Sequence, residues 1–305
     1  MFNNIRFIRL LALITVFMAG PALAADPVVV SSKIDTEGAV LGQLIFQSLE
    51  QAGIPVESRI QLGGTSIVRN AIKAGEIDIY PEYTGNAAFF HNQADSDVWK
   101  NADTAYAQAS KLDQDAHNIV WLTPANANNT WAMSVRGDLA REHQLTTLDD
   151  LADYVNNGGR FKFAASAEFV ESASALPAFQ AAYGFTLTAD QLLVLSGGNT
   201  AATLRAAALN NNQVNGAMAY GTDGGLDALD LKVLTDTRGV QPVYQPAAIV
   251  RAEVLAAHPN IATVLKPVFE SLDLATLRRL NGQVAVNGAP AQTVARQYLD
   301  ALSGN

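Results

Sequence analysis

The chain has 305 residues, with 20 basic and 29 acidic side chains and no cysteine. Arg6 and Arg9 are the only charged residues of segment 1–24, so the rest holds 18 basic against 29 acidic residues, a net charge of −11. That charge argues against binding to nucleic acid or to an anionic membrane surface. The lack of cysteine excludes disulfide bonds, thiol catalysis and Cys-ligated metal sites.

Residues 1–24 have the pattern of a secretory signal. Two arginines precede an apolar run of about a dozen residues, and the small residues Ala22 and Ala24 suit a cleavage site. The run is too short to span a bilayer, and no cysteine follows Ala24 for lipid attachment. We expect cleavage after Ala24 and export of a free, soluble protein to the periplasm.

The first half of the remaining chain alternates strand-like and helix-like segments. A short strand around Ile77 and Ile79 is expected to end at Tyr80-Pro81 and lead into a loop. The turn at Gly63-Gly64 precedes a helix with Thr65 as N-cap, which places a helix start beside a strand end. Strands are predicted at 28–30, 55–62, 118–122 and 131–135, and helices at 36–52, 66–74 and 102–116.

The pattern restarts after Arg136 and echoes the opening region: a Gly-Gly turn ending in Thr200, a helix bearing Arg205, then a strand ending in Tyr220. This echo predicts two similar α/β lobes with a ligand cleft between them. We expect lobe I at 25–130 and 244–305 and lobe II at 131–243, joined by crossovers near 126–131 and 240–246. Further strands are predicted at 161–165, 191–195, 216–220, 232–234 and 247–250, and helices at 148–156, 177–183, 201–209, 253–257, 261–272 and 291–302.

Enzyme signatures are absent from the sequence. It contains no Gly-x-Ser-x-Gly elbow, Walker loop, dinucleotide fingerprint or His-Glu-x-x-His motif. The four histidines are separated and lack ligand spacing, and Asp149-Asp150 suits the first turn of a helix. No catalytic residue, metal or cofactor is therefore expected.

Aromatic residues are the remaining candidates for a binding site. Tyr83, Trp131, Tyr220 and Tyr244 fall at predicted strand ends or crossovers rather than in apolar stripes. Several ring faces around one point bind a cation that cannot donate hydrogen bonds, each face contributing about 0.5–2 kcal/mol. Each residue alone would more often be a packing residue, and only their shared placement favours a cage.

The sequence resembles the substrate-binding proteins of osmoprotectant ABC importers, which bind glycine betaine, choline or carnitine, and is most similar to their YehZ/OsmF-like subgroup. The likeness covers essentially the whole chain after the signal, and implies the type II periplasmic-binding-protein fold. Its most specific segment is Tyr80-Pro81-Glu82-Tyr83-Thr84-Gly85. The other matching segments are Lys33-Ile34-Asp35-Thr36-Glu37, Gly64-Thr65, Asn129-Thr130-Trp131-Ala132 and Ala219-Tyr220-Gly221-Thr222-Asp223-Gly224.

The resemblance implies an aromatic cage of Tyr83, Trp131, Tyr220 and Tyr244. It also implies a polar end for the ligand carboxylate, formed by Lys33, Gly64, Thr65, Asn86, Asn129 and Ser172.

One departure concerns Ser172, which stands where many relatives carry an arginine that holds the ligand carboxylate; Glu171 adds a negative charge beside it. A lost charge-assisted bond costs about 1.5–3 kcal/mol. We therefore expect weak binding of glycine betaine, or a ligand without a carboxylate.

These features predict a monomeric periplasmic receptor that delivers a quaternary-ammonium solute to an ABC permease. The alternatives are a receptor for an unrelated small solute, a sensory module that reports to a membrane receptor, and, least favoured, an exported enzyme on the same scaffold.

Overall fold

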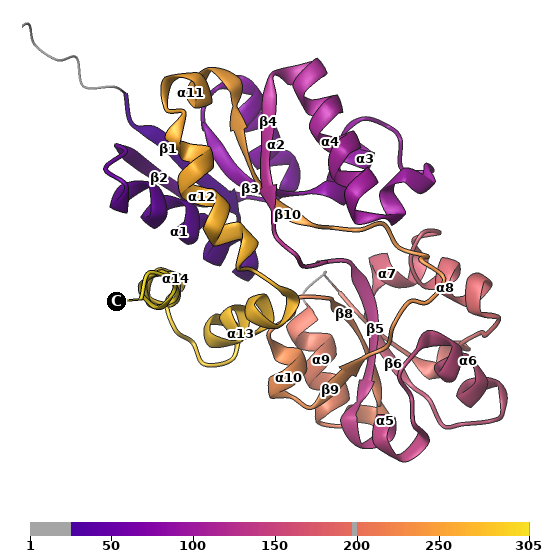
Figure 1. Cartoon of the computed structure of the whole chain (residues 1–305). Helices are drawn as coiled ribbons and strands as arrows, with labels where there is room; N and C mark the ends of the chain where they lie inside the picture. Colours follow the sequence, from indigo (N-terminus) through magenta and orange to yellow (C-terminus); the bar gives the residue numbers. More distant parts are fainter. Residues whose placement is uncertain (1–25, 197–199, 305) are drawn as a thin grey trace, which may run out of the picture.

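Two five-stranded mixed sheets, one in each half of the molecule, organise the structure (Figure 1). The computed structural model describes residues 26–196 and 200–304. The predicted signal segment with its cleavage site, and Gly197, Gly198 and Asn199 of the second Gly-Thr turn, lie outside the described residues.

The first sheet has the strand order β2-β1-β3-β10-β4, with β1 parallel to β2 and β3, and β10 antiparallel to β3 and β4. We call this sheet and its helices lobe I. Its strands are β1 (Val28–Lys33), β2 (Val56–Gly63), β3 (Ile79–Tyr83), β4 (Ile119–Pro124) and β10 (Pro246–Arg251). Its helices are α1 (Thr36–Gln51), α2 (Thr65–Ala74), α3 (Thr84–Phe90), η1 (Asp97–Lys100), α4 (Ala102–His117), α11 (Ala252–Ala257), α12 (Asn260–Glu270), α13 (Leu274–Ala285) and α14 (Ala291–Leu302).

The second sheet repeats this plan with the order β7-β6-β8-β5-β9, in which β6 is parallel to β7 and β8, and β5 is antiparallel to β8 and β9. This sheet and its helices form lobe II. Its strands are β5 (Trp131–Arg136), β6 (Phe163–Ser166), β7 (Leu192–Leu195), β8 (Gly216–Tyr220) and β9 (Leu231–Val233). Its helices are α5 (Gly137–His143), α6 (Leu148–Asn156), α7 (Ala167–Glu171), α8 (Leu176–Tyr183), η2 (Ala189–Gln191), α9 (Thr200–Ala208), η3 (Asn211–Gln213) and α10 (Gly225–Ala228).

The predicted echo between the two halves matches this shared topology. Helix α2 connects β2 to β3, and α9 connects β7 to β8, so the two helices occupy equivalent places in their lobes. Each lobe also receives one antiparallel strand from across the crossovers, β10 in lobe I and β5 in lobe II. The Tyr-bearing ends of β3 and β8 are therefore equivalent positions.

Strand β10 shows how the core fixes this arrangement. Its side chains alternate between two buried faces: Ala248 and Val250 pack with α1 and α12, and Ala247 and Ile249 pack with α2 and α4. A strand buried on both faces is held by hydrophobic burial as well as by its hydrogen bonds. The segment that returns from lobe II is thus an integral part of lobe I.

The two crossover segments lie side by side between the lobes. The Asn129 N–H donates to the Tyr244 carbonyl (2.9 Å), and the Thr130 hydroxyl donates to the Pro242 carbonyl (2.9 Å). A further backbone bond joins Ala125 N–H to the Pro246 carbonyl (2.8 Å). These bonds keep the connection between the lobes short and ordered.

Strand β3 differs from the sequence-based expectation, because it runs through Pro81 to Tyr83 instead of ending at Tyr80-Pro81. The described pairing of β3 with β1 is limited to Val30 and Ile79, so at Pro81 the strand pairs only with β10, opposite Ala248. A proline is tolerated where a strand is paired on one side, since one missing N–H then costs little.

Helices α3 and α13 were not predicted. Gly282 lowers the intrinsic helix propensity within α13, whereas Leu277 and Leu280 are buried in the lobe I core. Tertiary packing therefore stabilises this helix. It also reaches lobe II: Arg278 Nε donates to the Gly221 carbonyl (2.8 Å).

The contact between α13 and lobe II is a direct approach of backbone to backbone. A Cβ atom placed on Gly224 would lie 2.0 Å from the Gly282 nitrogen, a distance that no side-chain rotation can relieve. The neighbouring Gly225 differs, because its added Cβ would meet only side-chain ends, those of Leu204 at 3.1 Å and Leu229 at 3.6 Å.

We expect Gly224→Ala to lower the free energy of unfolding by about 1–3 kcal/mol, because it forces α13 away from lobe II. Gly225→Ala is the matched control and should cost less. Urea unfolding followed by circular dichroism measures both. Equal stability of the two variants would contradict the close backbone contact.

Candidate functional site

A cleft of about 1260 Å³ lies between the lobes and is lined from both of them. The four predicted cage residues Tyr83, Trp131, Tyr220 and Tyr244 all line it. Tyr83 ends β3 and Tyr220 ends β8, whereas Trp131 begins β5 directly opposite Tyr220. Tyr244 comes from the second crossover. Strand ends of both lobes and a connecting segment thus bring the rings to one cleft.

Gly85, the last residue of the Tyr-Pro-Glu-Tyr-Thr-Gly segment, is required for steric reasons. A Cβ on Gly85 would lie 2.8 Å from the ring of Tyr244, so only glycine lets that ring lie against α3. Thr84 fixes the same crossover, because its hydroxyl donates to the Val243 carbonyl (2.8 Å) and accepts from the Gln245 N–H (3.0 Å). The segment therefore holds the Tyr244 ring in place and carries the Tyr83 ring.

Trp131 is positioned by the lobe II core. Its ring meets Phe169 edge-on, with centroids 5.7 Å apart and planes at 80°. Its indole group also lies against the Tyr220 side chain, with which it forms a side-chain hydrogen bond. Ring packing against Phe169 and the contact with Tyr220 together set its position.

The three cage tyrosines remain neutral phenols. Burial raises the pKa of the Tyr83, Tyr220 and Tyr244 hydroxyls above the ordinary value. Their ring faces offer the quadrupole of a neutral aromatic, which attracts cations.

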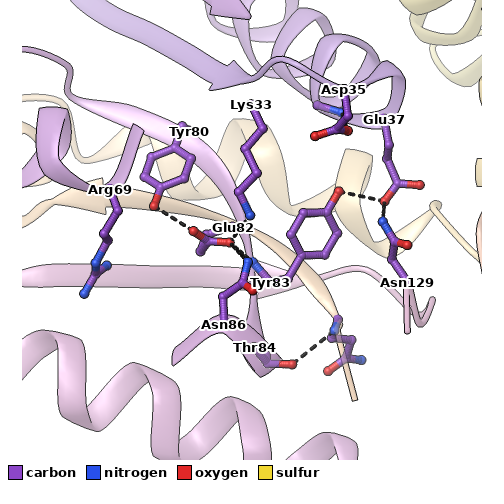
Figure 2. Close-up of polar contacts among 12 residues, drawn as sticks. Lys33, Asp35, Glu37, Arg69, Tyr80, Glu82, Tyr83, Thr84, Asn86 and Asn129 are labelled. Carbon is purple, nitrogen blue, oxygen red and sulfur yellow. Dashed lines mark hydrogen bonds and ion pairs between the residues drawn. The ribbon is translucent and has the colours of Figure 1, made fainter. Parts of the chain in front are cut away.

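Two of the predicted polar residues are bound to a carboxylate of the protein itself (Figure 2). Glu82 is fully buried and forms an ion pair with Lys33. It also accepts from the Asn86 amide (2.7 Å), the Tyr80 hydroxyl (2.8 Å) and the Tyr83 N–H (2.7 Å). Lys33 and Asn86 line the cleft, but both bind Glu82, and the Lys33 ammonium also lies over the Tyr83 ring, 4.5 Å from its centroid.

Glu37 is a second buried carboxylate at the cleft, in the first turn of α1 (Figure 2). It accepts hydrogen bonds from the Tyr83 hydroxyl (2.8 Å), the Asn129 amide (3.0 Å) and the Asn281 amide (2.6 Å). Burial raises the pKa of the Glu37 carboxyl to about 7, although hydrogen bonds from Thr222, Tyr83 and Asn281 lower it. A helix N-terminus favours the ionised form.

Of the other predicted polar residues, three line the cleft and one lies outside it. Thr65, Asn129 and Ser172 line the cleft. Gly64 does not; it is the N-cap residue of α2, and its carbonyl accepts from the N–H groups of Ile67 and Val68. The Ser172 hydroxyl lies 2.9 Å from the Ser174 hydroxyl.

Acidic residues outnumber basic ones around the cleft. The bases are Lys33, paired with Glu82, Lys100, paired with Asp97 (3.0 Å), and Arg205. The acidic lining residues are Asp35, Glu37, Asp95, Glu168 and Asp223. Burial raises the pKa of Asp223 to about 6. The described lining therefore favours a cation over an anion.

Sequence reasoning did not assign a role to Glu37, Glu82 or Asn281. Glu37 and Glu82 lie within the segments that carry the family resemblance, which was the available signal. Asn281 is 244 positions from Glu37 and lies in a helix that was not predicted. No local sequence pattern marks such a contact.

Comparison with known proteins agrees with this geometry. Residues 26–301 match the family model described as the substrate-binding domain of ABC-type glycine betaine transport systems. The chain belongs to this family. That span includes both sheets and every cleft residue named above, so the chain is a substrate-binding protein of an ABC import system.

Two relatives and one solved structure illustrate the likeness. The glycine betaine-binding protein YehZ of Escherichia coli K12 is 55% identical over 279 residues, 92% of each chain. A glycine-betaine-binding protein of Pseudomonas aeruginosa is 32% identical over 301 residues, 96% of this chain and 94% of that one. The structure of apo YehZ from Escherichia coli superposes with a TM-score of 0.83 at 55% identity, covering 91% of this chain and 99% of that chain. These matches confirm the predicted family and the two-lobed type II fold.

Two further observations concern the described ranges alone. No helix in residues 26–196 and 200–304 combines the length and apolar character that a bilayer crossing requires. Within the same ranges, no group of three His, Cys, Asp or Glu side chains could hold a metal ion.

We expect Lys33→Met to lower the free energy of unfolding by about 3–5 kcal/mol, because Glu82 would keep a buried charge without its ion-pair partner. Lys100→Met is the matched control, since Lys100 also lines the cleft but pairs at the surface. Its cost should stay below about 1 kcal/mol. Guanidinium unfolding of both variants without ligand tests the structural role of Lys33, and equal stabilities would contradict it.

Proposed function

We propose that this protein is a periplasmic receptor that closes its two lobes over a quaternary-ammonium compatible solute, glycine betaine or a choline-like cation. The observation that carries the proposal is the convergence of Tyr83, Trp131, Tyr220 and Tyr244 on one acidic cleft. A methylated ammonium has no N–H donor, so ring faces and apolar burial of its methyl groups are its main sources of affinity. Relatives named as glycine betaine-binding proteins support this ligand class.

The polar end of the cleft favours weak binding of glycine betaine. Lys33 and Asn86, which would meet the ligand carboxylate, already bind Glu82. Ser172 replaces the arginine expected from the family resemblance, and Thr65 and Asn129 add uncharged polar groups. Gly64 has no part in this proposal, because it does not line the cleft. A choline-like cation avoids the cost of an unpaired carboxylate.

Closure would occur by rotation about the two crossovers, where the boundaries between the lobes lie near residues 130/131 and 243/244. The hydrogen bond from Asn129 N–H to the Tyr244 carbonyl and that from Tyr244 N–H to the Asn128 side chain keep these segments together. A small backbone rotation there would move the cage residues of lobe II toward Tyr83. The closed form would dock as a monomer on an ABC permease of the inner membrane. The signal at 1–24 would direct export, and the protein would carry out no chemistry on its ligand.

Titration calorimetry with glycine betaine, choline and carnitine tests the ligand class. We expect choline to bind and Trp131→Ala to weaken it by about 2- to 30-fold, the loss of one ring face worth about 0.5–2 kcal/mol. Trp131→Phe keeps a ring and should retain more of the affinity. If Trp131→Ala bound the ligand as tightly as the wild type does, the proposed role of Trp131 in the cage would be contradicted.

A second titration tests the missing carboxylate anchor. We expect Ser172→Arg to tighten glycine betaine binding by about 10- to 100-fold, because it restores a charge-assisted hydrogen bond. It should not tighten choline binding. Ser172→Gln is the control of similar polarity without charge. Unchanged or weaker betaine binding by Ser172→Arg would contradict the argument.

A further inference from the structure

Glu37 is the carboxylate that connects the cage to both lobes. It reaches Tyr83 of β3 directly, the first crossover through Asn129, and α13 through Asn281. We propose that Glu37 is a positioning residue that makes the cage selective for cations: its buried negative charge acts on the ligand site and orients Tyr83. This inference rests on the proposed function.

The hydrogen bonds around Glu37 suit an ionised carboxylate. Its three partners in Tyr83, Asn129 and Asn281 all act as donors. The amide oxygens of Asn129 and Asn281 are buried and have no partner among the described residues. Both amides direct their N–H groups at Glu37, and donors of this kind favour its ionised form.

The charge of Glu37 is balanced by hydrogen bonds rather than by a cation. In the part of the chain that the structure describes, no Lys, Arg or His forms an ion pair with it, whereas Lys33 is paired with Glu82. Glu37 is only 5% exposed, so water screens its charge weakly. A cation in the adjacent cleft would be attracted by a carboxylate that no protein cation neutralises.

Tyr83 transmits part of this charge to the cage. A phenol that donates a hydrogen bond to a carboxylate becomes more electron-rich, and its ring face then attracts a cation more strongly. The same bond fixes the ring in the cleft. Removing the charge would therefore weaken cation binding more than the binding of a neutral molecule of the same shape.

Glu37 also reaches the loop that follows the other cage strand. One amide nitrogen of Asn281 donates both to Glu37 and to the carbonyl of Thr222 (2.9 Å), two residues after Tyr220. The Thr222 side chain hydrogen-bonds Glu37 as well. A single carboxylate thus links Tyr83 of lobe I with the loop that carries Tyr220 of lobe II.

This arrangement makes binding depend on pH. The pKa of Glu37 is about 7, and a bound cation favours the ionised form and lowers that pKa. Affinity for a cation is therefore full about one pH unit above that pKa, is about halved at the pKa, and falls further at lower pH. The charged or titratable groups that face this site are Asp35 at the N-cap of α1, Tyr83 on β3, Lys33 on β1, Asp223 after β8 and Arg278 on α13. Asp223 titrates lower, with a pKa of about 6.

Calorimetry with choline and its neutral isostere 3,3-dimethyl-1-butanol tests the proposal. At pH 8 we expect Glu37→Gln to weaken choline about tenfold or more and the isostere less than about twofold. Glu50→Gln makes the same change near the other end of α1, at an exposed position outside the cleft lining, and should leave both affinities near those of the wild type. Equal weakening of both ligands by Glu37→Gln, or no weakening, would overturn the proposal.

The pH profile of the unmodified protein gives an independent readout that does not depend on the variant folding. Between pH 8 and pH 6 we expect choline affinity to fall about tenfold with a midpoint near 7, in the wild type and in Asp223→Asn. Glu37→Gln combined with Asp223→Asn, which removes both carboxyls that titrate in this range, should show a flat profile. A flat wild-type profile would overturn the role of Glu37, whereas failure of the wild type to bind any quaternary ammonium would overturn the proposed function itself.

Discussion

The site depends on two carboxylates that are buried beside its rings and satisfied by hydrogen bonds. Glu82 is neutralised by Lys33, whereas Glu37 is held by neutral donors alone. Burying a charge is unfavourable unless its surroundings compensate, so the donors around each carboxylate are fixed with it. These bonds fix the positions of Tyr83, Asn86 and Asn129. The charge of Glu37, which no protein cation among the described residues neutralises, makes the cleft negative where a ligand cation would lie.

The second constraint is topological. Each lobe completes its sheet with a strand that reaches it through a crossover, and that strand is buried on both faces. The crossovers are therefore anchored at both ends and lie beside the carboxyl ends of β3 and β8, where an open α/β sheet binds ligands. A cage at this place necessarily contains residues from both lobes. Relative movement of the lobes would then open or close it.

Much of the fold and part of the site follow from the sequence. Apolar periodicity predicted α6, β8 and α14 with their observed bounds. The predicted strands at 131–135 and 216–220 place Trp131 and Tyr220 at strand ends that line the cleft, whereas the strand that carries Tyr83 was predicted to end too early. Partners distant in sequence were not predictable. Lys33 was predicted to bind the ligand carboxylate. No local sequence pattern indicates its ion pair with Glu82, because that pair forms only when β1 and β3 are neighbours in the sheet. Helix α13, and with it Asn281, is stabilised by packing that sequence propensity does not reveal. The individual roles of the cage residues remain predictions.

The most direct test of the account is whether a methylated ammonium lies between the rings. Choline carrying ¹³C-labelled N-methyl groups can be added to protein that is deuterated except at Tyr and Trp, and observed by nuclear magnetic resonance. The account predicts an upfield shift of the N-methyl protons, since protons above ring faces are shielded, and nuclear Overhauser effects to both Tyr and Trp ring protons that disappear for Trp in Trp131→Ala. N-methyl signals of bound choline without ring-current shift or contacts to Tyr and Trp would contradict it.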